Sequence, residues 1–397
     1  MTINRKSINK FLIYAFVFVT TLMPAESFNM KELFLGLILI TNIDTILNGF
    51  SKCVLGFGVL LPCWLLLISI IAGGNIVDSI RSVYIFTFIW IPVIALKYGI
   101  DLKRIFLNVT FYIAILIDAF VFLHATGLMP LQSNPLAMWL GESGNAQLSY
   151  GSVAIFYYVF FLNACPLLLF TLVDAMQNGN KIRIIMVIFA LMFSGTRANI
   201  YIGVVTVIAY LIVYKRNDWK KHLLIVGGGL LSIFVLICLA PTMVKKIQTI
   251  NSVKTFGDEV RAGRTVAAVG EIFGNTKVFF IGMGANVPFS ANGILNYSAE
   301  MSYIEVWRIY GVISFIAIVA MLVYLLWKNR KDAATIAYVG YLAICAVDPF
   351  LMTSTGFLMV MFMFYLFMSS AEMSAVASEE RHKVLKPLLP RVRLRIH

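Results

Sequence analysis

Long apolar runs recur along most of the chain, and they leave it few folds to adopt. A helix needs about 20 apolar residues to cross the hydrocarbon core of a bilayer, which is roughly 30 Å thick. Helices are the expected spanning elements, because they pair their backbone N–H and C=O groups within one segment. We therefore predict an all-α, polytopic membrane bundle of about twelve transmembrane helices. The expected spans cover residues 8–24, 32–48, 54–73, 79–96, 105–124, 151–173, 184–195, 198–214, 223–241, 303–327, 333–349 and 354–370.

The composition excludes a soluble globular protein. Of the 397 residues, 60% are hydrophobic and 13% are charged, whereas soluble domains have roughly 25% charged residues. The net charge of +13 needs no nucleic-acid partner, because basic residues at the inner face of a membrane pair with anionic lipid headgroups. The five cysteines lie within or beside apolar spans, so no disulfide framework is expected.

Lysine and arginine residues set the expected orientation. Short loops at the cytoplasmic face of a membrane protein carry an excess of these residues. Basic groups before the first span and after the fourth, eighth and tenth spans place both termini in the cytoplasm. We expect one membrane domain, residues 1–375, followed by a basic cytoplasmic tail, residues 376–397. Residues 242–302 then form a large external loop between the ninth and tenth spans.

This external loop is where chemistry in water is expected. Residues 258–273 have helical spacing, with valine, isoleucine and phenylalanine on one side and Arg261 and Arg264 on the other. We predict an amphipathic helix that lies along the membrane surface. Glu300 precedes a capping box, Ser302 to Glu305, that opens the tenth span. The macrodipole of that helix favours the ionised form of the Glu300 carboxylate.

Several polar residues near span ends have two interpretations each. A break in an apolar run ends at Arg197, and an arginine there is costly unless it faces a polar cavity. A functional site is therefore favoured over a surface anchor. Arg308 lies one helical turn after Glu305, which fits either a local ion pair or a phosphate contact. Tyr297 and Asn296 are either sugar-binding residues or ordinary turn residues.

Three patterns together resemble the bacterial O-antigen polymerases, within a superfamily that also includes the O-antigen ligases. The first is a break of small residues that ends in arginine, Ser194 to Arg197. The second is an arginine, a helix and a glycine pair, from Arg264 to the turn Gly282 to Gly284. The third is an acidic residue entering a late span that runs into glycine, Glu300 to Gly311. The resemblance covers residues 10–370.

The resemblance implies a glycosyltransferase that uses no nucleotide sugar and no cofactor. Such enzymes take a growing glycan from undecaprenyl pyrophosphate and transfer it to a new lipid-linked repeat unit. The reaction takes place at the periplasmic face of the bacterial inner membrane, with a flippase and a chain-length regulator as partners. No metal is expected, because the loop lacks clustered histidine, cysteine or paired carboxylate ligands.

Such a reaction needs cations and a proton acceptor. The leaving pyrophosphate gains negative charge in the transition state, and fixed arginines stabilise that charge. A carboxylate can accept the proton of the acceptor hydroxyl. We therefore expect Arg264 and Arg197 to stabilise the pyrophosphate, Arg261 to assist them, and Glu300 to act as the base.

Two other functions stay open. The related ligases are understood to use a histidine in their large loop, and no histidine lies between residues 241 and 301 here. This favours a polymerase, although His124 lies at the outer end of the fifth span. A flippase or another transporter would also suit twelve spans. Transporters often show repeated halves, whereas the large loop of this chain has no counterpart in its first half.

Overall fold

The computed structural model describes residues 4–25, 30–49, 51–153, 156–194, 196–214, 259–291 and 293–385. The expected ninth span, residues 223–241, and the end of the basic tail lie outside these ranges. The described chain is predominantly helical, as the sequence predicts.

Helices follow one another along the described chain, with two small antiparallel β-hairpins between them. The first helices are α1 (Arg5–Leu22), α2 (Met30–Thr41), α3 (Ile43–Asn48), α4 (Lys52–Leu55), α5 (Leu61–Ala72), α6 (Ile76–Val83), α7 (Trp90–Lys97), α8 (Leu102–Ala125) and α9 (Pro135–Glu142). The later helices are α10 (Leu168–Asn178), α11 (Lys181–Phe193), α12 (Arg197–Tyr214), α15 (Thr276–Ile281), α16 (Ser302–Lys328), α17 (Ala334–Cys345) and α18 (Ser354–Leu385). Shorter helical turns are η1 (Gly56–Leu60), η2 (Tyr84–Ile89), η3 (Leu131–Ser133) and η4 (Cys165–Leu167). The hairpins pair β1 (Ala146–Val153) with β2 (Phe156–Leu162), and β3 (Phe289–Ala291) with β4 (Ile294–Asn296).

Within the described residues, five helical stretches are long and apolar enough to cross a membrane. They cover Lys52–Ala72, Ile76–Lys97, Leu102–His124, Ser302–Lys328 and Ser354–Ala371. Two shorter apolar helices are Ala198–Tyr214 and Ala334–Cys345. These stretches are those of a helical membrane protein, but they are fewer than the spans expected from the sequence.

The prediction of a sixth span over residues 151–173 is wrong. The structure has the hairpin β1–β2 there, with Ala146 opposite Leu162, and helix α10 begins only at Leu168. The periodicity of a short apolar run does not distinguish a strand from a helix. The segment 156–162 consists mainly of aromatic residues, which favour strands.

Three other expected spans are broken or short. The span expected over 32–48 is interrupted at Asn42, where the side-chain amide donates to the Ile38 carbonyl and α2 gives way to α3. The spans expected over 184–195 and 333–349 correspond to α11 and α17, which have 13 and 12 residues. At a rise of about 1.5 Å per residue, each covers roughly 20 Å, less than the bilayer core.

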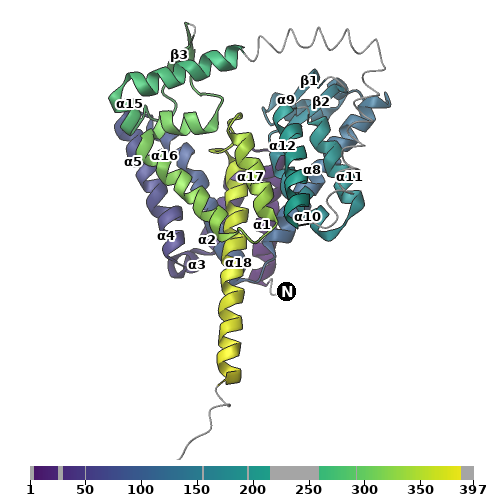
Figure 1. The fold of residues 1–397 in the computed structure, drawn as a ribbon, viewed down its shortest axis with the longest axis vertical. Coiled ribbons are helices and arrows are strands. Elements are labelled where there is room, and N and C mark those ends of the chain that lie inside the picture. Colours follow the sequence, from purple (N-terminus) through teal and green to yellow (C-terminus); the bar gives the residue numbers. More distant parts are fainter. Residues whose placement is uncertain are drawn as a thin grey trace, which may run out of the picture.

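Helix α18 passes through the middle of the molecule and carries much of its core (Figure 1). Its residues from Phe357 to Phe364 are all buried. Phe362 stacks on Phe106 of α8 with ring centroids 4.3 Å apart, and Phe357 lies 4.4 Å from Phe86 of η2. In Figure 1, α5, α15 and α16 lie on one side of α18, and α8, α10 and α11 lie on the other. This aromatic packing holds α18 against α8 and η2.

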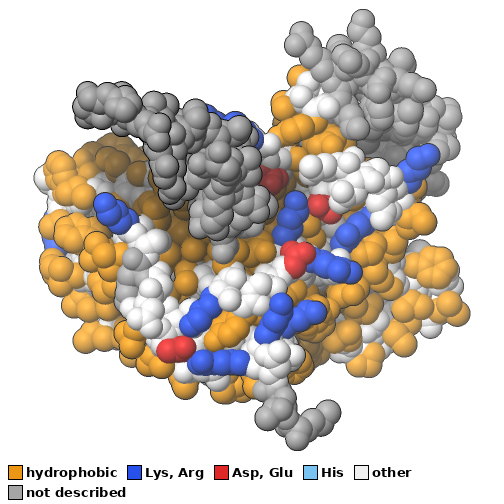
Figure 2. Space-filling model, turned by 90° about the horizontal axis from the view of Figure 1, so that it is seen from below, with side chains coloured by type: hydrophobic (Ala, Val, Ile, Leu, Met, Phe, Trp, Pro, Cys, Tyr) orange, Lys and Arg blue, Asp and Glu red, His pale blue; other side chains and the backbone are white. Residues whose placement is uncertain are grey.

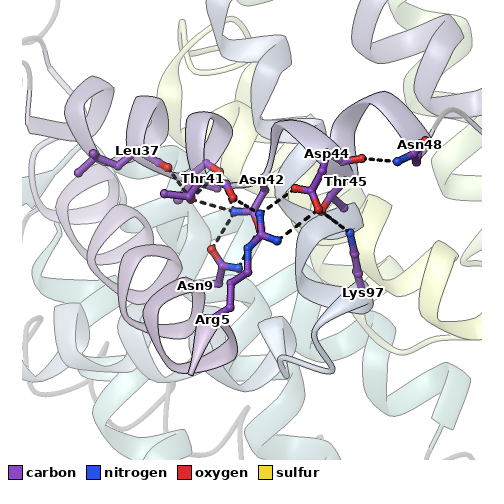
Figure 3. A network of polar contacts seen from close by, with 10 residues as sticks. Arg5, Asn9, Leu37, Thr41, Asn42, Asp44, Thr45, Asn48 and Lys97 are labelled. Carbon is purple, nitrogen blue, oxygen red and sulfur yellow. Dashed lines mark hydrogen bonds and ion pairs between the residues drawn. The ribbon is translucent and has the colours of Figure 1, made fainter. Parts of the chain in front are cut away.

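A polar network closes the end of the molecule at which the chain begins (Figure 3). Asp44 of α3 pairs with Arg5 of α1 at 2.8 Å and with Lys97 of α7 at 3.3 Å. Asn9 and Asn42 exchange two amide hydrogen bonds of 2.9 and 2.7 Å, and both side chains are buried. Lysine and arginine side chains gather at this end within a hydrophobic rim (Figure 2). It is the end that the sequence predicts to be cytoplasmic.

We expect the amide pair between Asn9 and Asn42 to stabilise the contact between α1 and α2 measurably. Asn42→Ala leaves the buried Asn9 amide without its partner, which should lower the free energy of unfolding by about 1–3 kcal/mol. Asn9→Ala should lower the free energy of unfolding by less when Asn42 is already alanine. The difference, which is the coupling energy of the pair, should be about 0.6 kcal/mol or more. Denaturant unfolding of both single variants and the double variant in detergent measures this coupling. Strictly additive losses would show that the two amides do not act as a pair.

Candidate active site

Residues 259–274 form the helix that the sequence predicts in the external loop. Its inward face matches the prediction only in part. Ile272 of the expected apolar face is buried, whereas Val266 of that face is 70% exposed and Ala268 is fully buried instead. At about 100° per residue, Arg261 and Arg264 project on the same side as Ala268. The arginines therefore face the body of the protein instead of lying opposite its apolar contacts.

A glycine joint fixes the loop after this helix against α16. The N–H groups of Met283 and Gly284 donate to α16 carbonyls at 2.7 and 3.0 Å. Helix α16 is kinked at Gly311, whose φ is +73°. A Cβ on Gly311 would lie 2.1 Å from the Phe280 carbonyl oxygen. Glycine is required here because it adopts this φ freely and lets two backbones approach closely.

Arg308 is fully buried and ties the hairpin β3–β4 to α16. A guanidinium has five N–H donors, and those of Arg308 all have acceptors within the protein. The acceptors are both oxygens of Glu305 at 2.9 and 2.8 Å, the carbonyls of Val287 and Tyr297 at 2.9 and 3.0 Å, and the sulfur of Met283 at 3.8 Å. Glu305 also accepts the Ala299 N–H at 2.8 Å. The structure thus shows the local ion pair, and every Arg308 donor already has an acceptor within the protein.

Arg261, Arg264 and Glu300 meet beside the start of α16. The Arg264 Nη1 lies 2.8 Å from one Glu300 oxygen, and the Arg261 Nε contacts the other. The Arg261 Nη1 also lies 3.6 Å from the Oδ1 of Asp348, which belongs to the turn between α17 and α18. We call these four residues the arginine–carboxylate cluster. The side chains of Arg261 and Arg264 remain 54% and 36% exposed, so an anion can reach them from outside.

Asp348 is the cluster member that the sequence did not single out as a site residue. Its backbone carbonyl accepts the Ser302 hydroxyl at 2.7 Å, and the same hydroxyl accepts the Leu351 N–H at 3.1 Å. Burial raises the pKa of the Asp348 carboxyl above its ordinary value; Arg261 lowers this pKa in part, and the charge of Glu300 raises it further. The sequence signal was only an acid at the end of an apolar run.

No family model and no curated protein matches this chain. The chemistry of the site must therefore be argued from its own residues. Among the residues that the structure describes, no three His, Cys, Asp or Glu side chains are grouped so as to hold a metal ion. The cluster offers two planar cationic groups and two carboxylates. Such a set can bind a phosphate-bearing anion and exchange a proton.

Arg197 begins α12, and its side chain lies outside the described part of the structure. The backbone of α12 packs along α17, where Gly340 lies against Thr206 and Ile202. The Tyr214 hydroxyl at the end of α12 donates to the Lys331 carbonyl just before α17, so the two helices run antiparallel. At about 1.5 Å per residue, the start of α12 is then level with the end of α17 that leads to Asp348. Arg197 thus lies at the same end of the molecule as the cluster, and its contact with substrate stays a prediction.

The two sugar-binding candidates lie at the end of β4. The Asn296 amide donates to the Ile294 carbonyl at 2.8 Å, which is a turn contact. The Tyr297 backbone carbonyl accepts a hydrogen bond from Arg308, while its ring is exposed. Of the two, Tyr297 is the one whose side chain can meet a ligand without losing a hydrogen bond of the turn.

Proposed function

We propose that the chain is a membrane glycosyltransferase of the O-antigen polymerase kind, acting at the periplasmic face of the bacterial inner membrane. The observation that supports this best is the arginine–carboxylate cluster, in which two arginines of the loop helix meet carboxylates beside the ends of apolar helices. The cluster lies at the end of the molecule opposite the amino terminus (Figure 1). With both termini cytoplasmic, the cluster is periplasmic.

The two arginines fit a donor in which the glycan is carried by undecaprenyl pyrophosphate. When the bond to the sugar breaks, its electron pair stays on the diphosphate, which gains negative charge. Arg261 and Arg264 are paired with Glu300 in the structure, and a diphosphate presents oxygens in a similar arrangement. It can therefore compete with Glu300 for the two guanidinium groups. Their charge then stabilises the transition state more than the ground state.

A carboxylate of the cluster completes the reaction by accepting the proton of the acceptor hydroxyl. Glu300 is the base expected from the sequence, and Asp348 is a second carboxylate on the same arginine. Both lie where a sugar held against Arg261 could reach them. No nucleotide sugar is required, because the pyrophosphate is itself the leaving group.

Deleting the gene in the bacterium that carries it tests this function. We expect surface glycan to shrink to a single repeat unit on its lipid anchor, because units are still made, moved across the membrane and attached. Glycan that is polymerised but unattached would indicate a ligase, and absence of glycan from the surface would indicate a flippase. A normal ladder of chain lengths would rule out the polymerase.

A further inference from the structure

Arg261 is shared by two carboxylates that are held differently. Glu300 has an arginine nitrogen at each of its oxygens. Asp348 has one arginine nitrogen at 3.6 Å, which is too far for a hydrogen bond. Its side chain is only 11% exposed. Glu300 is therefore the engaged carboxylate, and Asp348 is the more buried and less engaged one.

We propose that Asp348, and not Glu300, accepts the proton of the acceptor hydroxyl, and that Arg261 controls when it can do so. This inference rests on the proposed function. While Arg261 lies between the two carboxylates, its charge offsets both. A donor diphosphate that draws Arg261 and Arg264 onto its own oxygens leaves Asp348 buried beside the negative charge of Glu300. A carboxylate in that position binds a proton more tightly, so the base becomes effective only when the donor is bound.

The described groups around Asp348 are consistent with control by Arg261. Arg261 from the helix 259–274 and Glu300 from the segment before α16 are its charged neighbours among these residues. The Cys345 thiol of α17 also interacts with the Asp348 carboxylate. Ser302 of α16 contributes a neutral hydroxyl that binds the Asp348 backbone carbonyl. Moving Arg261 is thus the change that most alters the charge balance at Asp348.

The proposed transfer is a nucleophilic displacement at the anomeric carbon of the donor sugar. The acceptor oxygen forms a bond to the anomeric carbon of the donor sugar, while the bond from that carbon to the diphosphate oxygen breaks. The electron pair of the broken bond leaves on the lipid diphosphate, held by Arg261 and Arg264. The hydroxyl proton passes to Asp348, and it is released to water when the diphosphate departs and Arg261 returns.

Counting protons during donor binding tests the inference. The probe is a short-chain prenyl diphosphate esterified with a sugar, a diester that has no proton to exchange near neutral pH. It is titrated by calorimetry into the purified full-length protein, in two buffers that differ in ionisation enthalpy. We expect wild type to take up well under one proton, because the part of Asp348 that stays ionised is the active base. Asp348→Asn should bind the probe at least as tightly without proton uptake. Glu259→Gln, on the exposed start of the same loop helix, should behave like wild type.

Turnover gives a second readout. Asp348→Asn should lower the elongation rate by roughly 10²–10⁴-fold and remove the acidic limb of its pH profile, with little change in donor KM. Asp348→Glu should restore part of the elongation rate and part of the acidic limb. If Asp348→Asn does not fold, infrared difference spectra of wild type and Asp348→Glu upon probe binding give the same test. The band of the newly protonated carboxyl should differ in position between the two proteins.

The outcomes distinguish the role of Asp348 from the proposed function on which that role rests. Three results would each overturn the role of Asp348 while leaving donor binding intact. They are absence of proton uptake in wild type, unchanged proton uptake in Asp348→Asn, and an infrared carboxyl band that does not shift in Asp348→Glu. Failure of wild type to bind the probe would contradict the proposed function, and the role of Asp348 with it.

Discussion

Gly311→Ala is expected to lower the free energy of unfolding by roughly 3–5 kcal/mol. Residue 311 has φ +73° and ψ 172°, a backbone conformation that is nearly restricted to glycine. The added Cβ would also lie 2.1 Å from the Phe280 carbonyl oxygen, so α15 and the kinked helix α16 would have to separate. Gly282 faces the same joint from the other side, with a Cβ position 2.2 Å from the Ile309 oxygen. Gly282→Ala should therefore have a comparable effect.

Thermal and denaturant unfolding in detergent measures this loss, and limited proteolysis shows whether the loop 259–300 is released first. Gly36→Ala is the matched control, because Gly36 lies in helix α2 with nothing within 4 Å of its Cβ position. That substitution should be neutral or stabilising by up to about 1 kcal/mol, since alanine favours helix more than glycine does. Equal stability of Gly311→Ala and wild type would show that α15 and α16 do not meet as described.

Arg264→Ala should lower the elongation rate by about 10²–10³-fold, the loss typical when one hydrogen-bond donor to a transition state is removed. Arg264→Lys should recover little, because lysine lacks the planar fork that matches two phosphate oxygens. The loss should appear mainly in kcat, since in the proposed reaction the charge next to Arg264 develops as the sugar–phosphate bond breaks. Single-turnover elongation of lipid-linked repeat units by purified variants measures it.

Arg81→Ala provides the control for removal of a positive charge at the same end of the molecule. Arg81 is 59% exposed and pairs with Asp78 at 3.8 Å in helix α6, and exposed pairs of this kind contribute only about 0–1 kcal/mol. Its elongation rate should match wild type. Full activity in Arg264→Ala would remove Arg264 from the proposed mechanism.

The length of an apolar run predicted the long helices well and the short ones poorly. The span expected over 303–327 corresponds to α16, and the span expected over 105–124 corresponds to α8. The hairpin β1–β2 was not predicted, because a run of apolar residues fits a strand as well as a helix. The aromatic content of residues 156–162 was the only local feature that favoured a strand. The break at Asn42 depends on its hydrogen bonds to Ile38 and Asn9, and the latter is a contact between helices.

The site was predictable as far as its residues lie in one loop. Arg261, Arg264 and Glu300 belong to one segment, the loop that the sequence predicts over residues 242–302, and the structure brings their side chains into contact. The turn at Gly282 to Gly284 was also expected, but its docking against Gly311 depends on tertiary packing. Asp348 approaches Arg261 from the turn after α17, which the Ser302 hydroxyl holds through two hydrogen bonds. No local pattern contains that contact.

The decisive measurement is elongation by the purified protein supplied only with defined lipid-linked repeat units, without nucleotide sugar or added metal. We expect chains of two or more units and release of one undecaprenyl pyrophosphate per new linkage. Both products should fall together in Arg264→Ala and stay unchanged in Arg81→Ala. Repeat units that remain single in the presence of folded wild-type protein would contradict a polymerase built on this arginine–carboxylate cluster.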